Sequence, residues 1–422
     1  MLQNPFYLFF TACLGLFFWA GYRRIFAEVP YRHSLWSFLG EECAQGQRRA
    51  IVRALLAGLP GDSGAMAWIL TMAALCLGGA GALFWYLVFS LLWLHPLGAL
   101  AGLWCYYQPG CGGRVELSAL LEGILCRKRA RARPGLGRLL RWLQTLALCG
   151  MLPLLFRILA SPSAPARGAG LLPWLVVLLA LWLLCRLVGE RGETVLSLLF
   201  LLLLAAALLG NLPNLIPAVK LVLLDAFDRS RFLFSLSGAG LAAALQAGGA
   251  AGCGGALLRT LSAREEGPSF AHPAQAAFYE ELRGLLQLTV QLALGLLFLC
   301  ARLVPEDNRW PQTCLWAFLC LFGLLWLGRA VRALARPEGR RCGLLCLGLV
   351  GAAAVWDIWK GTALLPGLSG GAAGLASLAL AGLLLFDSNW YFLLLEHYRD
   401  VHIWHVTPHP DLMQAERERK DL

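Results

Sequence analysis

The sequence predicts an all-α polytopic membrane protein, and three observations lead to that fold class. The 422 residues are 59% hydrophobic and only 14% charged, whereas soluble domains carry about 25% charged residues. The mean hydropathy is +0.64. The hydrophobic residues also gather in runs near the roughly 20 residues that cross a bilayer. This composition argues against a soluble enzyme, a disordered chain and a nucleic-acid-binding protein, and it makes the lipid bilayer the main partner.

The apolar runs place about eleven transmembrane helices along the chain. The first covers residues 6–20 and has no basic residue before it, so we expect an uncleaved span rather than a secretory signal. The other spans are expected near residues 64–79, 82–104, 139–160, 171–188, 194–216, 236–258, 283–303, 312–328, 342–358 and 366–386. The run 64–79 is short and rich in glycine and alanine, which suits a broken helix. We expect one transmembrane domain over 1–386 and a cytoplasmic or interfacial C-terminal tail over 387–422.

The net charge of +11 is distributed as short basic clusters between the apolar runs. With the N-terminus outside, most clusters fall in cytoplasmic loops, and so does the C-terminus, in agreement with the positive-inside rule. The segment with Lys220, Arg229 and Arg231 is the exception. The basic loop 127–141 could bind nucleic acid or anionic lipid, but a topology determinant against an anionic leaflet is the favoured interpretation.

Motifs for catalysis or resident metal binding are absent from the sequence. It has no P-loop, no nucleophile elbow and no zinc-protease helix, so we expect no enzyme. The 14 cysteines lack zinc spacing and are expected to be free thiols, although Cys105 and Cys111 could pair. In the tail, His402 and His405 could share a helical face, as metal ligands would. The mixture of histidine, tryptophan and tyrosine in the tail favours a half-buried interfacial segment instead. We expect no cofactor and no metal site.

Charged residues within or beside the spans are candidates for function because charge is costly in lipid. They are Arg157, Lys220, Asp225, Glu280, Glu281, Asp357 and Lys360. Most lie close enough to a helix end to reach water. Asp357 is the best candidate for a buried role, and it could pair with Lys360 on one helix face. The glycines between 248 and 255 suit either close helix packing or a helix break that lines a substrate path.

Four segments, in order along residues 1–386, resemble one family, the bacterial alanine/glycine:cation symporters. They are Gly-Gly-Ala-Gly-Ala-Leu-Phe-Trp at 78–85, Ile-Pro-Ala-Val-Lys-Leu at 216–221 with Ala-Phe at 226–227, Ala-His-Pro-Ala-Gln at 271–275, and Asp-Ile-Trp-Lys-Gly at 357–361 with Leu-Leu-Pro-Gly-Leu at 364–368. The resemblance implies eleven helices, ten of them in two inverted five-helix repeats with broken helices. It also implies a bacterial cytoplasmic membrane, a small amino acid such as alanine or glycine as solute, and sodium as the coupling ion.

The resemblance places the substrate and cation site on three segments. Its candidate residues are Gly64, Ala65, Met66, Ala67, Gly254, Gly255, Asp357, Gly361 and Gly367. No particular oligomeric state is favoured.

Departures from the family pattern support a second hypothesis. The family's Gly-Thr-Gly-Asn-Ile-Ala-Gly falls on Gly-Ala-Met-Ala-Trp-Ile-Leu at 64–70, and its Ser-Asn-Glu-Ala-Gly falls on Gly-Ala-Leu-Leu-Arg at 255–259. Most polar site groups are therefore missing. The alternative is a degenerate, non-transporting membrane scaffold or sensor, which we expect if Met66, Trp68, Leu257 and Leu258 fill the middle of the protein.

Overall fold

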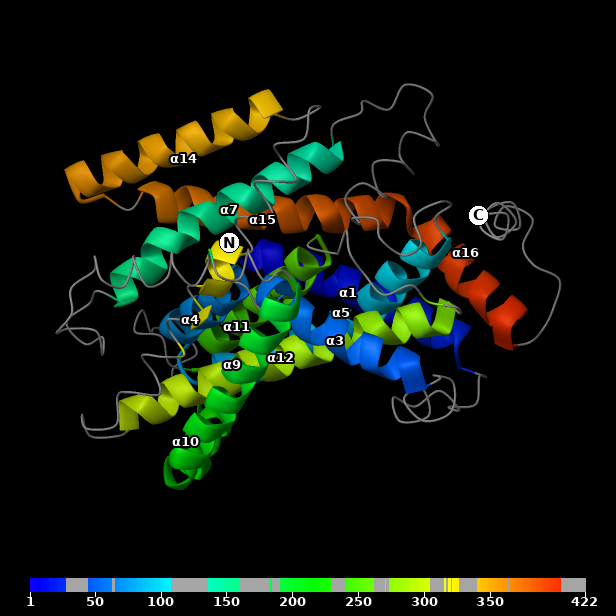
Figure 1. The fold of residues 1–422 in the computed structure, drawn as a ribbon, viewed down its shortest axis with the longest axis horizontal. Helices are drawn as coiled ribbons and strands as arrows, with labels where there is room; N and C mark the ends of the chain where they lie inside the picture. The colour runs from blue at the N-terminus through cyan, green and yellow to red at the C-terminus, as the bar shows by residue number, and fades with distance from the viewer. Residues whose placement is uncertain are drawn as a thin grey trace.

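The fold is all helical over the residues that the computed structural model describes (Figure 1). These residues are 1–27, 45–62, 65–107, 136–159, 183, 190–228, 240–261, 270, 273–303, 315, 318–319, 321–325, 340–362 and 364–403. The expected spans at 171–188 and 312–328 lie mainly outside these ranges.

Six helices of the described residues are long and apolar enough to cross a membrane. They are α1 (Pro5–Ile25), α5 (Ala82–Tyr107), α9 (Glu190–Gly210), α11 (Leu241–Leu261), α12 (Pro273–Leu303) and α15 (Leu364–Phe386). The predicted all-α membrane class is thus confirmed. The number of about eleven spans and the inverted repeats stay predictions.

Glycine and alanine at the helix contacts set how closely the central helices pack. A Cβ on Gly248 would touch the Ala82 carbonyl, and one on Gly252 would lie 2.7 Å from the Tyr86 carbonyl oxygen, so α11 and α5 run parallel with their backbones in contact. Gly102 of α5 meets the backbone of Ala277, which holds α12 equally close. In a membrane, contact between helices removes no apolar surface from water. Helices therefore attract one another mainly through close packing, which small residues permit. These helices form the centre of the molecule.

The remaining helices flank this centre. They are α3 (Gln45–Asp62), α4 (Ala65–Gly78), α7 (Leu136–Leu159), α10 (Leu212–Phe227), α14 (Arg340–Lys360) and α16 (Ser388–Tyr398), and a π-helical turn, η1 (Arg399–Ile403), follows α16. Helices α7, α14 and α15 pack together along one side, and α10 projects from the opposite side (Figure 1). Helix α4 packs on α11.

Two short breaks separate helices that follow one another along the chain. The span expected at 194–216 ends early, because α9 stops at Gly210 and α10 starts at Leu212. The Asn211 side chain donates to the Ala207 carbonyl at 2.8 Å, and a proline opens α10, where its missing N–H has no helical partner to lose. The second break, between the spans expected at 64–79 and 82–104, separates α4 from α5 at Gly79, whose φ of 72° favours glycine.

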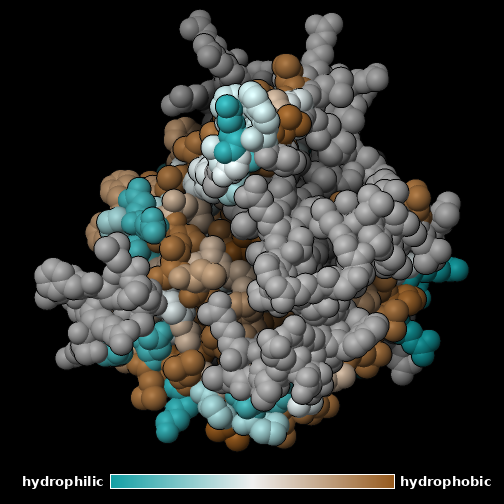
Figure 2. Space-filling view, turned by 90° about the vertical axis from the view of Figure 1, so that its left-hand side faces the viewer, coloured by the Kyte–Doolittle hydropathy of each residue, from teal (hydrophilic) through white to brown (hydrophobic). Residues whose placement is uncertain are grey.

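Much of the surface is apolar. Figure 2 shows hydrophobic side chains spread over one face, with hydrophilic ones toward its margins. Ile216 on α10 and Trp359 on α14 are 76% and 71% exposed, values that are high for large apolar side chains on a soluble protein. These helices therefore contact the lipid bilayer.

The start of the expected C-terminal tail is helical and packed. Tyr391 of α16 meets Phe18 of α1 edge to face, with ring centroids 5.0 Å apart. Arg399 donates to the carbonyl of Ile25 at 3.4 Å. Residues 388–403 therefore cover one end of α1, and the rest of the tail lies outside the described residues.

Candidate functional site

Helix α12 carries a buried polar stripe. Its members follow one another at intervals of four residues, so consecutive members are neighbours on the helix surface and the stripe winds around α12. They are Gln275, Tyr279, Arg283, Gln287 and Gln291, with exposed fractions of 5%, 1%, 3%, 4% and 0%. Polar groups buried among apolar helices are unfavourable unless they are hydrogen-bonded, and in membrane proteins they mark functional sites by default. The stripe was not predicted, although the interval of four was visible in the sequence.

The deep end of the stripe meets polar groups from two other helices. Thr71 of α4 donates to the Ala67 carbonyl at 3.1 Å, and its hydroxyl lies 3.5 Å from Oε1 of Gln291. The Tyr86 hydroxyl of α5 lies close to the side chains of Thr71 and Ser90. We name Thr71, Tyr86, Ser90 and Gln291 the central cluster. All four side chains are buried.

Gly255 of α11 lies directly beside the central cluster. A Cβ on Gly255 would lie 3.5 Å from the Tyr86 hydroxyl, an ordinary van der Waals distance. Helices α4, α5, α11 and α12 therefore meet at one polar point. Hydroxyl and amide oxygens, with the Ala67 carbonyl, are the kind of ligands that hard cations take, and they also hydrogen-bond small polar solutes.

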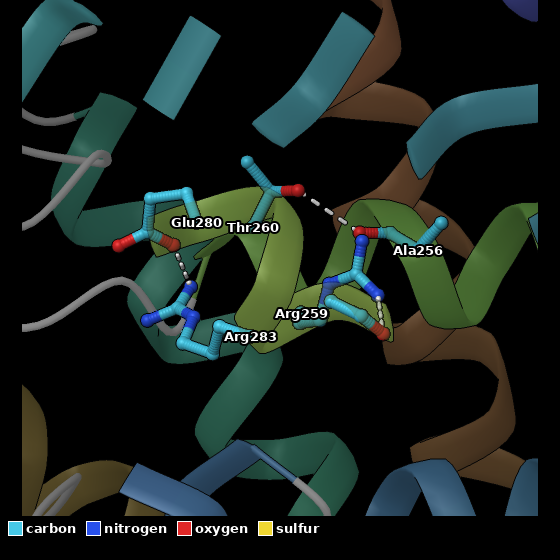
Figure 3. A network of polar contacts seen from close by, with 6 residues as sticks. Ala256, Arg259, Thr260, Glu280 and Arg283 are labelled. Atoms are coloured by element: carbon cyan, nitrogen blue, oxygen red, sulfur yellow. Dashed lines mark hydrogen bonds and ion pairs between the residues drawn. The ribbon is translucent and has the colours of Figure 1, made fainter. Parts of the chain in front are cut away.

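Charged groups lie farther along the same helices (Figure 3). Arg283 of α12 pairs with Glu280 at 2.8 Å. Arg259 of α11 donates to the Gly284 carbonyl at 3.3 Å, one helical turn beyond Gly255, and its charge acts on Tyr86. The side chains of the central cluster are therefore uncharged, and Arg259 lies near them.

The structure brings some of the predicted site residues to this cluster. Ala67 takes part through its carbonyl, whereas Ala65 and Met66 are placed only as the first residues of α4. Gly255 borders Tyr86. Gly64 lies outside the described residues.

Gly254 has a different neighbour from Gly255. A Cβ on Gly254 would lie 2.8 Å from the Tyr7 hydroxyl of α1, which is itself 2.7 Å from the Ser377 hydroxyl of α15. The α11 backbone is a continuous helix through both glycines, so no helix break occurs at this point. Gly254 thus serves helix packing, and Gly255 faces the cluster.

Asp357, Gly361 and Gly367 lie at the junction of α14 with α15. The Asp357 carboxylate accepts hydrogen bonds from the Thr362 hydroxyl at 2.6 Å and from the backbone N–H groups of Leu364 and Leu365 at 2.7 Å. It therefore caps the first turn of α15, whose N–H groups have no helical acceptor. Gly361 has a φ of +64°, as the sharp turn requires. Gly367 is exposed on α15.

The expected pairing of Asp357 with Lys360 gives way to other contacts. The Lys360 ammonium lies over the Trp359 ring, 4.2 Å from its centroid. This is a cation–π contact. Asp357 instead turns to the N-terminus of α15.

Apolar side chains fill part of the predicted site. Trp68, Leu257 and Leu258 are 2%, 0% and 4% exposed and belong to the main hydrophobic core. They lie on the two helices, α4 and α11, that the resemblance assigns to the solute. Within the described part of the chain, no group of three or more His, Cys, Asp or Glu side chains is arranged to hold a metal ion.

Comparison with known proteins adds a distant likeness in fold. No protein-family model matches the chain, and no curated protein is similar to it in sequence. A variant of a manganese transporter from Eremococcus coleocola covers 93% of this chain and 86% of its own, at 14% identity and a TM-score of 0.49. A second variant covers 93% and 94% at 13% identity and a TM-score of 0.47. At these values the likeness assigns neither a family nor a solute to this chain.

Proposed function

We propose that this chain is a secondary transporter of a small polar solute, which binds at the central cluster. One observation carries the proposal: four helices of an apolar bundle each turn a polar group or a bare glycine toward the same buried point. Thr71 and Gln291 are fully buried, and Tyr86 is 4% exposed. Such a convergence is unfavourable in lipid, and binding of a polar ligand is the usual reason for it.

We further propose a small amino acid such as alanine or glycine as the solute and sodium as the coupling ion. The resemblance to the alanine/glycine:cation symporters motivates both. The hydroxyls of Thr71 and Tyr86 and the amide of Gln291 can accept from an ammonium group and coordinate Na⁺. Arg259, one turn away, supplies a positive charge for a carboxylate. Gly255 has no side chain, and the space that this leaves beside the Tyr86 hydroxyl is large enough only for a small group of the solute.

Flux into proteoliposomes tests this function. The full-length protein is reconstituted, and uptake of labelled alanine and glycine is measured with and without an inward sodium gradient. We expect uptake that the gradient accelerates and that Thr71→Val lowers at least about tenfold, since about 1.4 kcal/mol of lost binding corresponds to a factor of ten. Thr145→Val is the matched control, because Thr145 is also buried and donates to a carbonyl one turn earlier, at 2.8 Å, but on α7.

A second candidate is the non-transporting scaffold or sensor, which the burial of Trp68, Leu257 and Leu258 favours. It predicts that neither amino acid with sodium raises the thermal unfolding midpoint, since a ligand stabilises only a protein that binds it. A reproducible rise of several degrees with alanine and sodium contradicts the scaffold. No flux for any small amino acid, together with no rise, contradicts the transporter.

A further inference from the structure

His95 of α5 and Glu281 of α12 face each other within two of the candidate membrane spans. His95 Nδ1 lies 3.5 Å from Glu281 Oε2, and the two side chains are 50% and 12% exposed. The spans that contain them are Ala82–Trp104 and Pro273–Cys300. A carboxylate buried to this degree requires a partner, and a half-exposed imidazole can exchange protons with its surroundings.

The close approach of α5 and α12 holds Glu281 in place. A Cβ on Gly98 would lie 2.8 Å from Cγ of Glu281 and 3.2 Å from its backbone nitrogen. The missing side chain of Gly98 therefore creates the space that Glu281 occupies. The neighbouring carboxylate, Glu280, turns to Arg283 instead, at 2.8 Å. Two adjacent acidic residues thus have different partners, and only Glu281 faces His95.

Tyr22 of α1 completes the surroundings of the imidazole. Its ring is nearly parallel to that of His95, with an interplanar angle of 13° and centroids 6.0 Å apart. A protonated imidazole gains from the Glu281 carboxylate and from the electron-rich face of Tyr22, whereas a neutral imidazole loses most of both attractions.

We propose that His95 and Glu281 form a proton-binding site, separate from the central cluster, whose occupancy tightens the contact of α1, α5 and α12. His95 donates through Nδ1–H to Glu281 in both states. The added proton comes from water, binds at Nε2 and returns to water when the pH rises. This inference goes beyond the proposed function and does not require that the protein transports a solute.

Other titratable and charged groups lie on the helices around the pair. They are Tyr22 from α1, Tyr391 from α16 and Arg259 from α11, with Glu280 and Arg283 on α12 itself. Burial, with smaller contributions from Tyr22 and Glu281, raises the pKa of the Tyr391 hydroxyl well above its usual range, so this phenol stays neutral. Among these groups, the imidazole is the one whose ordinary titration falls between about pH 5 and 8.

Two features connect the site to the rest of the fold. Pro96 follows His95 inside α5 and has no N–H to bond the preceding turn, so the helix is weakened at this point. The ring of Tyr22 also contacts Phe26, with centroids 4.9 Å apart, and Phe26 contacts Tyr398 of α16 at 6.1 Å. A change at His95 is therefore transmitted to the packing of α16 on α1.

Histidine NMR on the full-length protein in detergent micelles tests proton binding directly. With ring-labelled histidine, the His95 signal is identified by its loss in His95→Gln. We expect this signal to titrate between about pH 5 and 9 and its midpoint to move in Glu281→Gln. The matched control, Glu280→Gln, moves it much less. A His95 signal that does not titrate, or that Glu281→Gln leaves unchanged, overturns the proposal.

Variants with a fixed charge provide an independent test. Between about pH 5.5 and 8.5 we expect the thermal unfolding midpoint of the wild type to fall by about 2 °C more than that of His95→Arg, which stays charged. His95→Gln has the lower midpoint at both pH values. The His397 ring packs on Tyr107 of α5 with centroids 5.2 Å apart, and His397→Gln keeps the wild-type pH dependence. If His95→Arg and His95→Gln also keep it, the site does not bind the proton.

Discussion

The carboxylate of Asp225 on α10 accepts a hydrogen bond of 2.7 Å from the backbone N–H of Gly81, at the start of α5. The contact continues along both segments, because Trp85 donates its indole N–H to the Ala226 carbonyl at 3.0 Å. Two of the segments that resemble the alanine/glycine:cation symporters, 78–85 and 216–227, are therefore parts of a single structural unit. A negative charge at a helix N-terminus also interacts favourably with the positive end of the helix dipole.

Asp225→Ala is expected to lower the free energy of unfolding by about 1–3 kcal/mol, because the Gly81 N–H loses a charged acceptor in a partly buried place. Denaturant unfolding in micelles measures the loss. The control is Lys220→Gln, a charge change on the exposed side of the same helix, with an expected effect within about 0.5 kcal/mol. Equal losses in the two variants contradict a specific role of the Asp225 carboxylate.

Gly252→Ala is expected to destabilise the protein by about 1–3 kcal/mol, since its Cβ would lie 2.7 Å from the backbone oxygen of Tyr86, which cannot move without α5. Gly382→Ala on α15 is the matched control, with no atom within 4 Å of the new Cβ. That exposed substitution is neutral or stabilises by up to about 1 kcal/mol, because alanine favours helices. A tolerated Gly252→Ala contradicts the observed contact of α5 with α11.

Asp357→Ala is expected to lower the unfolding free energy by about 1–3 kcal/mol through loss of the α15 cap, while the KM for solute and sodium of the folded fraction stays unchanged. Asp357→Asn retains one acceptor oxygen and is milder. If either variant raises the KM for sodium severalfold with unchanged stability, Asp357 belongs to the binding site, as the resemblance implies.

Hydrophobicity was enough to predict the long apolar helices, because a membrane-spanning helix can be recognised from its length and composition alone. Helix α3 was not predicted, since its sequence contains arginine and glycine between the apolar positions. Its position depends on Ile51 and Leu55, which pack on Tyr279 of α12. Tertiary contacts of this kind leave little trace in a hydropathy pattern. The same reason applies to α16, whose Tyr391 packs on Phe18.

The predicted site residues and the central cluster share some positions. The motif positions led to α4 and to Gly255, which border the central cluster, but the motif does not show which side of a helix faces a site. Gly254 and Gly255 are adjacent and yet contact Tyr7 and Tyr86 on different helices. The glutamines of α12 were missed because they are uncharged, and a search for charged residues passes over them.

The two glycines also make the sharpest prediction for the site. A Cβ on Gly255 meets the Tyr86 hydroxyl at 3.5 Å, so Gly255→Ala fits and the unfolding midpoint should change by less than about 2 °C. The new methyl group nevertheless occupies space beside the central cluster. We expect uptake of glycine to survive and uptake of alanine to fall, since one methyl group in a tight pocket is worth about 1–3 kcal/mol. Gly254→Ala, which meets the Tyr7 hydroxyl at 2.8 Å, should lower stability without changing the ratio of the two uptakes. An unchanged alanine-to-glycine ratio in Gly255→Ala, measured in proteoliposomes, contradicts the placement of the solute beside Tyr86.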